Sequence, residues 1–186
     1  MKLVILDRDG VINHESRAYI KTPAEWLPLP GSLEAIAKLS QANYKVFVTT
    51  NQSGVGRGYF DLEMLHAIHH KMHQAVIHHG GKIDKIYYCP HLPDASCKCR
   101  KPLPGMFEQL SIDYNVDLAK IKPPYIGDSL RDLQVGLSVG CNFYLTTGAG
   151  GDGMETLNKL TPDQTQQINV VENLATAVDH ILSCNK

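Results

Sequence analysis

The feature that most constrains the fold is a short apolar segment near the start of the chain that stops abruptly at two aspartates. Leu3 to Leu6 are four consecutive apolar residues, and Asp7-Arg8-Asp9-Gly10 follows them directly. An unbroken apolar run of this length is typical of a β-strand that is buried on both faces. The start of the sequence therefore predicts a buried strand with two carboxylates at its carboxyl end.

Apolar runs and helical patterns then alternate along the chain. Further strands are predicted at 44–48, 83–88, 125–126 and 143–145, and helices that begin near 31–32, 62, 106, 130 and 173. This alternation predicts an α/β fold, Rossmann-like, with a mostly parallel sheet and helices on both faces. Because the chain has 186 residues, of which 43% are hydrophobic, we expect one globular domain over residues 1–186.

Charge and hydropathy limit the partners and the location. The formal net charge is −1, which gives no electrostatic reason to expect a nucleic acid or a membrane as a partner. No run reaches the roughly 18 apolar residues that a membrane span needs. The N-terminal apolar run is also interrupted by charge too early for a signal peptide. We therefore expect a cytoplasmic protein, and we predict a monomer.

Polar residues recur where the predicted strands end. Asp7 and Asp9 follow the first strand, Thr50 follows the second, and Asp128 follows a later one. In a parallel sheet these ends lie at one edge, which is where sites gather. Carboxylate oxygens are the ligands that Mg²⁺ prefers, and Mg²⁺ commonly shares its shell with substrate phosphate. Together with Lys101, the set predicts a magnesium site that binds a phosphate ester.

These residues resemble the four sequence motifs of the haloacid dehalogenase superfamily. The matching segments are Asp7-x-Asp9-Gly10-Val11, Thr50, Lys101-Pro102 and Gly127-Asp128-x-x-x-Asp132. The resemblance implies a phosphatase in which Asp7 is the nucleophile and forms an aspartyl-phosphate, while Asp9 is the general acid and base. It also implies that Mg²⁺ is held by Asp7, Asp128 and the backbone carbonyl of Asp9. Asp132 either orients Lys101 or caps its own helix.

A second cluster of metal-ligand residues lies at residues 89–101, which we call the zinc loop. The candidate ligands are Cys89, His91, Cys97 and Cys99. Three thiolates and one imidazole are a common tetrahedral set for structural Zn²⁺, closed to further ligands. Because Arg100 and Lys101 follow directly, a metal in this loop is expected to fix two cations over the active site.

Within the superfamily, the zinc loop resembles that of the heptose-bisphosphate phosphatases, and histidinol-phosphate phosphatases have a similar loop. Residues 19–31 and 51–58 also resemble the heptose group, which acts in lipopolysaccharide precursor synthesis. The expected activity is therefore removal of the 7-phosphate from a heptose 1,7-bisphosphate, with histidinol phosphate as the alternative substrate. The expected substrate contacts are Glu15, Arg17, Tyr19, Thr50, Asn51, Ser53, Arg57, Arg100 and Lys101. The short chain fits a substrate enclosed by loops, without a large cap domain, and Arg57 suits a second phosphate.

Three other interpretations carry less weight. A zinc-stabilised binding module without catalysis has no need for carboxylates at several strand ends. Gly148 to Gly153 matches a dinucleotide-binding pattern, but too few residues follow for the unit such a site needs, so we interpret it as a flexible loop near the mouth of the site. His66, His69, His70 and His73 recur at helical spacing, and we interpret them as a polar helix face rather than a metal site.

Overall fold

The computed structural model describes residues 1–148 and 150–184, and at its centre lies a six-stranded sheet in which neighbouring strands are parallel. The strand order is β3-β2-β1-β4-β5-β6. The strands are β1 (Leu3–Leu6), β2 (Lys45–Asn51), β3 (Lys85–Cys89), β4 (Pro124–Gly127), β5 (Asn142–Thr146) and β6 (Asn169–Val171). β1 therefore lies between β2 and β4, and the predicted parallel sheet is confirmed.

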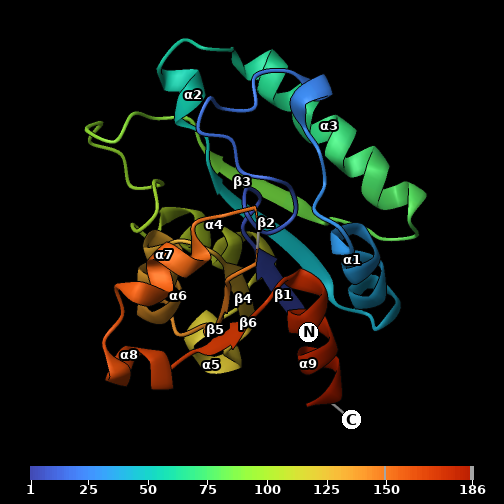
Figure 1. Cartoon of the computed structure of the whole chain (residues 1–186), viewed down its shortest axis with the longest axis vertical. Coiled ribbons are helices and arrows are strands. Elements are labelled where there is room, and N and C mark those ends of the chain that lie inside the picture. The colour runs from blue at the N-terminus through green and yellow to red at the C-terminus, as the bar shows by residue number, and fades with distance from the viewer. Residues whose placement is uncertain (149, 185–186) are drawn as a thin grey trace.

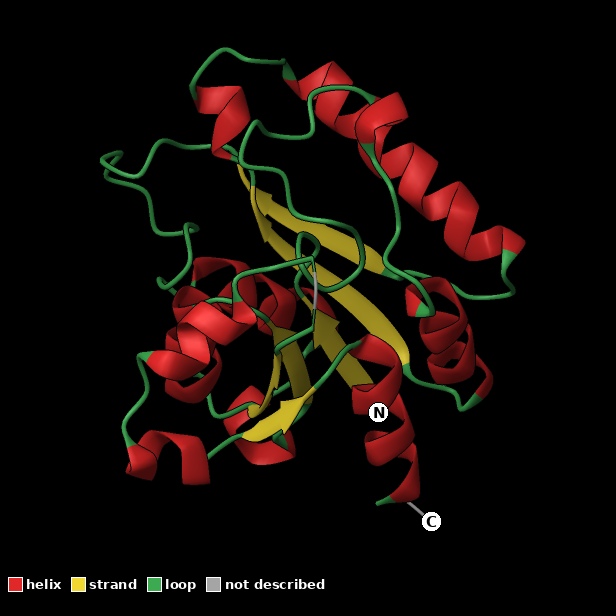
Figure 2. Ribbon diagram, viewed as in Figure 1, coloured by secondary structure: helices red, strands yellow, loops and turns green. Residues whose placement is uncertain are grey.

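Helices cover both faces of the sheet, as predicted (Figures 1 and 2). One face carries α1 (Ser32–Gln41), α3 (Leu62–His78) and α9 (Leu174–Ser183). The other face carries α4 (Gly105–Tyr114), α5 (Leu118–Ile121), α6 (Leu130–Ser138) and α7 (Gly153–Asn158). The connections contain α2 (Ser53–Gly56), α8 (Pro162–Gln166) and the 3-10 helix η1 (Pro23–Glu25). Between β1 and α1 the described chain contains only η1, so no cap domain is inserted there.

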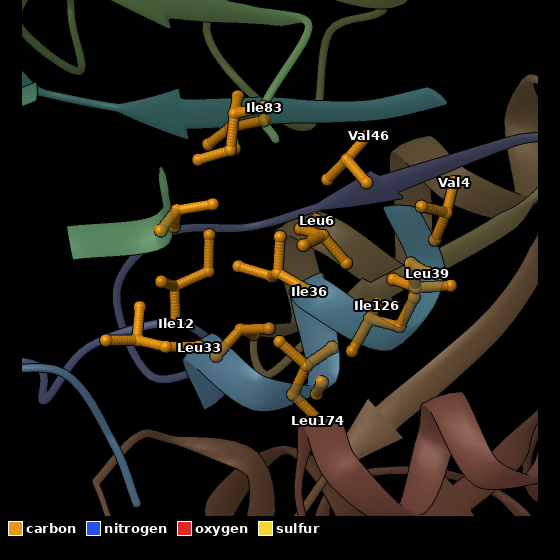
Figure 3. Close-up of a cluster of buried hydrophobic side chains, with 14 of the residues drawn as sticks. Val4, Leu6, Ile12, Leu33, Ile36, Leu39, Val46, Ile83, Ile126 and Leu174 are labelled. Carbon is orange, nitrogen blue, oxygen red and sulfur yellow. The ribbon is translucent and has the colours of Figure 1, made fainter. Parts of the chain in front are cut away.

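The four central strands β2, β1, β4 and β5 are buried on both sides because their side chains alternate between two hydrophobic clusters. In β1, Val4 and Leu6 face one cluster while Leu3 and Ile5 face the other, and all four are at most 2% exposed. Figure 3 shows the first cluster, in which Ile36 of α1 packs against the strands. Each fully buried aliphatic side chain of this kind contributes about 1.5–3 kcal/mol. The two layers of helices therefore hold the strand ends in fixed positions.

The longer elements agree with the sequence prediction, and the differences have simple causes. β2 continues three residues beyond its predicted end. Thr49 and Thr50 are β-branched and fit a strand even where they break an apolar run, and Asn51 is the last residue of the strand. The elements that were not predicted contain three to six residues each. So few side chains cannot display a periodic pattern. Within the described residues, no helix has the length and apolar character needed to cross a membrane.

Candidate active site

The carboxyl ends of adjacent strands bring three aspartates together. Asp7 follows β1, Asp128 follows β4, and Asp132 lies in the first turn of α6. They are 8%, 4% and 0% exposed, and each offers a carboxylate oxygen within 4.8 Å of the others. A cavity of about 80 Å³ opens onto this cluster. Its lining is Asp7, Asp9, Glu15, Thr50, Asn51, Lys101, Asp128, Ser129, Arg131 and Asp152.

Lys101 is the cation that lies among these aspartates. Its Nζ is 2.9 Å from Asp7 Oδ1 and 2.6 Å from Asp132 Oδ1. It also donates to the carbonyl oxygen of Thr49 at 2.8 Å, and the residue is only 2% exposed. Burial alone would lower the pKa of Lys101, but the carboxylates of Asp132 and Asp7 outweigh it and raise the pKa above its usual value. The side chain is therefore held as an ammonium between two aspartates.

Asp132 performs both of the roles that the sequence left open. Its Oδ1 accepts from Lys101 and, at 2.6 Å, from the hydroxyl of Tyr125, so it orients the lysine. Its Oδ2 accepts from the Ser129 N–H at 3.1 Å, while the Ser129 hydroxyl accepts from the Asp132 N–H, which forms a capping box at the start of α6. Burial would raise the pKa of Asp132, but Lys101, Ser129 and Tyr125 together hold it below the usual value.

The cluster carries more negative charge than Lys101 neutralises. Burial and the charge of Asp132 raise the pKa of Asp7 to about 7, against the opposing pull of Lys101. Burial and the charges of Asp7 and Asp132 raise the pKa of Asp128 well above its usual value. Because neighbouring negative charges raise these pKa values, Asp7, Asp128 and Asp132 can all be ionised together only when another cation is present. Because hard oxygen donors converge here, the residues present fit Mg²⁺.

Asp9 lies beside this cluster, and three side chains hold its carboxylate. Arg8 donates to Oδ1 from Nε at 3.2 Å and from Nη2 at 3.0 Å, and Nη2 also lies 3.0 Å from Oδ2. Asn13 donates to Oδ1 at 2.8 Å, and Gln52 donates to Oδ2 at 2.9 Å. The buried Trp26 fixes Asn13 in turn, since its Nε1 donates to Asn13 Oδ1 at 2.9 Å. Both carboxylate oxygens are thus engaged, and their orientation is set from several sides.

The two residues that end β2 differ in what their side chains do. Thr50 is 1% exposed, lines the cavity, and accepts a hydrogen bond from Gln52 at 2.9 Å. The Asn51 side chain instead donates to the carbonyl oxygen of Lys101 at 3.1 Å and accepts from its N–H at 3.0 Å. Asn51 was expected to hold phosphate. Its side-chain amide fastens the zinc loop to β2, and the contact with phosphate stays a prediction for its backbone N–H, since Asn51 lines the cavity.

A larger cavity of about 370 Å³ adjoins the first and contains the predicted substrate residues. Those that line it are Glu15, Arg17, Tyr19, Asn51, Ser53, Arg57 and Arg100. Arg131, which was not predicted, lines both cavities together with Asp9. Burial and the charge of Arg131 lower the pKa of Arg100, so the two guanidinium groups lie in each other's field. Such a concentration of arginines suits a second phosphate.

The glycine-rich segment 148–153 borders the smaller cavity. The N–H of Asp152 donates to Asp128 Oδ2 at 2.8 Å. Gly151 approaches so closely that a Cβ atom there would lie 2.1 Å from Asp128 Oδ2, which only glycine avoids. The predicted position near the mouth of the site is confirmed, although Ala149 lies outside the described residues.

The four candidate zinc ligands also converge. Cys89 is the last residue of β3 and is fully buried, and its Sγ lies 3.8 Å from Cys97 Sγ and 3.5 Å from His91 Nδ1. His91 Nδ1 lies 3.2 Å from Cys99 Sγ. Tetrahedral Zn²⁺ with bonds of about 2.0–2.3 Å separates its ligand atoms by roughly 3.5–3.8 Å. Burial raises the pKa of Cys89 to about 12, so a cation is needed to hold the thiolate form. The loop therefore fits zinc.

Comparison with known proteins agrees with this geometry. Residues 2–138 match the family described as Polynucleotide kinase 3 phosphatase. The D-glycero-β-D-manno-heptose-1,7-bisphosphate 7-phosphatase of Bordetella bronchiseptica is 50% identical over 183 residues, which cover 98% of each chain. The protein of the same name from Pseudomonas aeruginosa is 48% identical over 176 residues, or 95% of this chain and 97% of that one. The chain belongs to this phosphatase family.

A solved structure extends the likeness to three dimensions. The D,D-heptose 1,7-bisphosphate phosphatase from B. bronchiseptica, complexed with magnesium and phosphate, matches with a TM-score of 0.91 at 49% identity, covering 98% of this chain and 99% of that one. A protein from Mesorhizobium loti described as a HAD-like phosphatase also matches, with a TM-score of 0.76 at 27% identity, covering 97% of this chain and 87% of that one. The chain therefore has the fold of the haloacid dehalogenase superfamily, and with phosphatases as its relatives it is an enzyme. The alternative of a zinc-stabilised module without catalysis is excluded.

Some residues around the phosphatase's site were not predicted, and one prediction was wrong. The residues missed are Arg8, Asn13, Gln52, His69, Tyr125 and Arg131. His66 and His70 are exposed, as a polar helix face requires, but His69 is only 7% exposed and lies 3.2 Å from Arg8. The sequence held a signal for this, because His69 follows the buried Ile68 and precedes Met72 by three residues, on the apolar side of α3.

Proposed function

We propose that this phosphatase removes the 7-phosphate of D-glycero-β-D-manno-heptose 1,7-bisphosphate by way of an aspartyl-phosphate on Asp7. The observation that carries the proposal is the pair of adjoining cavities. The smaller contains Asp7 and Lys101 and suits the phosphoryl group under attack, while the larger is rich in arginine and suits a second phosphate on the same sugar. Relatives that are 50% and 48% identical over nearly their whole length carry this activity, and this anomer, in their names.

In the proposed first step, a carboxylate oxygen of Asp7 attacks phosphorus and the bond between phosphorus and the sugar oxygen breaks. Asp9 donates a proton to that oxygen, so the sugar leaves as an alcohol rather than an alkoxide. Lys101 stays paired with Asp132, and this pairing holds its ammonium beside Asp7. The ammonium stabilises the negative charge that moves onto the phosphoryl oxygens during the attack.

In the proposed second step, water attacks the phosphorus of the aspartyl-phosphate and Asp9 takes a proton from it. The bond between phosphorus and the Asp7 oxygen breaks, which releases inorganic phosphate and restores the Asp7 carboxylate. A group that first protonates the departing sugar oxygen and then deprotonates the water must lie where the smaller cavity meets the larger one. Asp9 lines both cavities, which supports this assignment.

We propose two metal ions as cofactors. Mg²⁺ is assigned to the carboxylates of Asp7 and Asp128 and to the backbone carbonyl of Asp9, and when bound it neutralises charge on the phosphoryl oxygens. The raised pKa of both carboxyl groups supports this, as does the magnesium named with the related crystal structure. Zn²⁺ is assigned to the zinc loop, where it has a structural role.

The substrate assignment is tested by comparing three phosphate esters. Release of inorganic phosphate is measured from the heptose bisphosphate, from histidinol phosphate and from an oligonucleotide with a 3′-phosphate. We expect kcat/KM to be highest for the bisphosphate by about 10- to 150-fold, because a charge-assisted contact to a second phosphate is worth about 1.5–3 kcal/mol. Preference for histidinol phosphate or for the oligonucleotide would overturn the proposal.

Removing the zinc site is expected to lower both stability and rate. Cys99→Ser removes one ligand, and the loop then loses the constraint that places Arg100 and Lys101. We expect the Tm to fall by on the order of 10 °C, corresponding to a loss of about 3 kcal/mol or more, and kcat to fall with it. Calorimetry and zinc content measure the effect. Cys184→Ser, which removes an exposed thiol far from the loop, is the control and should behave as wild type.

Arg57→Met is expected to weaken binding of a bisphosphate selectively. Arg57 lines the larger cavity but not the smaller one, so its guanidinium is placed for the second phosphate rather than the reacting one. We expect KM for the heptose bisphosphate to rise about tenfold, equivalent to about 1.4 kcal/mol, with kcat little changed. p-Nitrophenyl phosphate carries a single phosphate and serves as the control substrate. An equal rise in KM for both esters would remove Arg57 from this role.

Four further statements remain predictions. We propose that residues 1–186 form one domain, that the enzyme is monomeric and cytoplasmic, and that it binds neither nucleic acid nor membranes. Limited proteolysis and sedimentation of the purified protein test the first two, and cell fractionation with nucleic-acid and vesicle binding assays tests the others.

A further inference from the structure

Arg8 is a buried charge for which the proposed mechanism has no use. It stands between the two catalytic aspartates in the sequence, its side chain is only 2% exposed, and it lines the larger cavity but not the cavity of Asp7. Burying a guanidinium is costly unless each of its donors finds a partner. The partners it has found are therefore informative about what the residue does.

One end of the guanidinium is fastened to Asp9. Nε and Nη2 of Arg8 lie 3.2 and 3.0 Å from Asp9 Oδ1, and Nη2 lies 3.0 Å from Oδ2. A guanidinium is a planar fork, so contacts from two of its nitrogens fix the plane and the rotation of the carboxylate as well as its position. The orientation of the Asp9 carboxyl group therefore follows the orientation of the Arg8 fork.

The other end of the guanidinium is fastened to His69. Arg8 Nη1 lies 3.2 Å from His69 Nε2, across 61 positions of sequence, and His69 is 7% exposed on the inner face of α3. Arginine has only donors, so this ring nitrogen accepts and the proton of the neutral ring lies on Nδ1. Burial and the charge of Arg8 lower the pKa of His69 to about 3, so the ring remains an acceptor at any working pH.

We propose that His69 is a positioning residue that acts through Arg8 to aim the carboxyl group of Asp9 at the oxygen of the leaving group. The inference rests on the proposed role of Asp9 as general acid. Without the acceptor at His69, Nη1 has lost its partner and the fork can turn about its long axis. Asn13 and Gln52 each supply one hydrogen bond to one oxygen of Asp9, whereas Arg8 contacts both oxygens, so a turn of the Arg8 fork shifts the balance of forces on the carboxylate. A misaimed acid slows proton transfer to the leaving group and leaves attack by Asp7 unaffected.

The experiment compares two esters that differ in their need for a proton. The sugar oxygen of the heptose bisphosphate would leave as a poor alkoxide unless the general acid protonates it, whereas p-nitrophenolate is a stable anion that leaves without a proton. kcat/KM reports the steps up to formation of the aspartyl-phosphate, so it is measured for both esters with the magnesium-loaded enzyme. The variants are His69→Leu, which removes the acceptor, and His69→Gln, which supplies an amide oxygen in its place.

We expect His69→Leu to lower kcat/KM for the heptose bisphosphate about tenfold and to leave p-nitrophenyl phosphate nearly unchanged. His69→Gln should recover most of the loss. His73→Leu is the matched control, because it removes another histidine of α3, whose Nε2 lies 3.1 Å from the Ile83 carbonyl oxygen. It should not change the ratio of kcat/KM between the two esters. If His69→Leu does not fold, Arg8→Lys, which keeps the charge but not the fork, is expected to show the same selective loss.

Asp9→Asn separates this inference from the function on which it rests. Losing a general acid costs about 10²–10⁴-fold, so Asp9→Asn should lose far more on the heptose ester than on p-nitrophenyl phosphate. Suppose that Asp9→Asn shows this selectivity but His69→Leu lowers kcat/KM equally for both esters, or for neither. The positioning role of His69 is then refuted, and the proposed function stands. If Asp9→Asn itself slows both esters equally, Asp9 is not the general acid, and the inference fails along with that assignment.

Discussion

Asp7→Asn is expected to abolish turnover while the protein still folds and binds its substrate. The amide has nearly the shape of the carboxyl group but cannot attack phosphorus, so no aspartyl-phosphate forms and kcat should fall by about 10⁴-fold or more. Lys101, Asp128 and the arginines of the larger cavity remain in place for binding. Phosphate release gives the loss of rate, and calorimetric titration with the bisphosphate and magnesium gives the binding. More than a trace of remaining activity would exclude a covalent mechanism on Asp7.

The same substitution is expected to stabilise the metal-free protein at alkaline pH. The pKa of Asp7 is about 7 in the folded protein, against 3.8 for an ordinary aspartate. Below the lower value both states are protonated and there is no effect. As pH rises through this range the unfolded chain ionises first, so folding loses stability, and the loss is complete above about pH 7. The loss amounts to at most about 4 kcal/mol, which is the difference between the two pKa values multiplied by about 1.4 kcal/mol per unit.

Thermal unfolding without magnesium tests this second effect. Asp7→Asn should unfold at a higher temperature than wild type at pH 8, and the difference should shrink towards pH 5. Asp163→Asn removes an exposed aspartate on α8 and is the control, with little change at either pH. If the Asp7 variant were less stable than wild type at pH 8, the carboxylate cluster would not be strained in the absence of metal.

Features that belong to a single strand or loop could be predicted from the sequence. The buried strand before Asp7 is visible as a run of apolar residues. Because Asp7, Asp9 and Gly10 follow that run, the sequence also shows that the candidate active site lies at the carboxyl end of the strand. The four candidate zinc ligands lie within eleven residues of sequence, so their convergence needs little tertiary information. The fold and the main carboxylates were therefore accessible without a structure.

Features that depend on how separate elements meet were not accessible. Gln52 and Asn13 are ordinary polar residues in sequence. Gln52 reaches Asp9 because β2 packs beside β1, and Asn13 reaches it through a local turn that the buried Trp26 holds in place. Asn51 is predicted to hold phosphate because of its motif, and its side-chain bonds to the backbone of Lys101, fifty residues away, could not be foreseen from that motif. Arg131 is exposed on α6, and its place between two cavities follows from loops that the sequence does not position.

Lys101→Met is expected to cost both stability and activity, because it leaves two buried carboxylates without their cation. Asp7 and Asp132 lie 2.9 and 2.6 Å from the ammonium, and Asp132 is fully buried. Breaking a buried pair by removing one partner typically costs about 3–5 kcal/mol. Loss of the charge beside the nucleophile should also lower kcat by about 10²–10³-fold. Denaturant unfolding without magnesium and phosphate release with it measure the two effects.

A second substitution in the same background shows whether charge or packing is responsible. Asp132→Asn added to Lys101→Met removes the unpaired carboxylate but keeps a group that Tyr125 and Ser129 can bind, so much of the lost stability should return. Activity should not return, because the phosphoryl group still lacks its lysine. Lys98→Met removes an exposed lysine of the same loop and should change the free energy of unfolding by less than about 0.5 kcal/mol. If the double variant were no more stable than Lys101→Met, the cost would come from the packing of the lysine stem rather than from the aspartates that it separates.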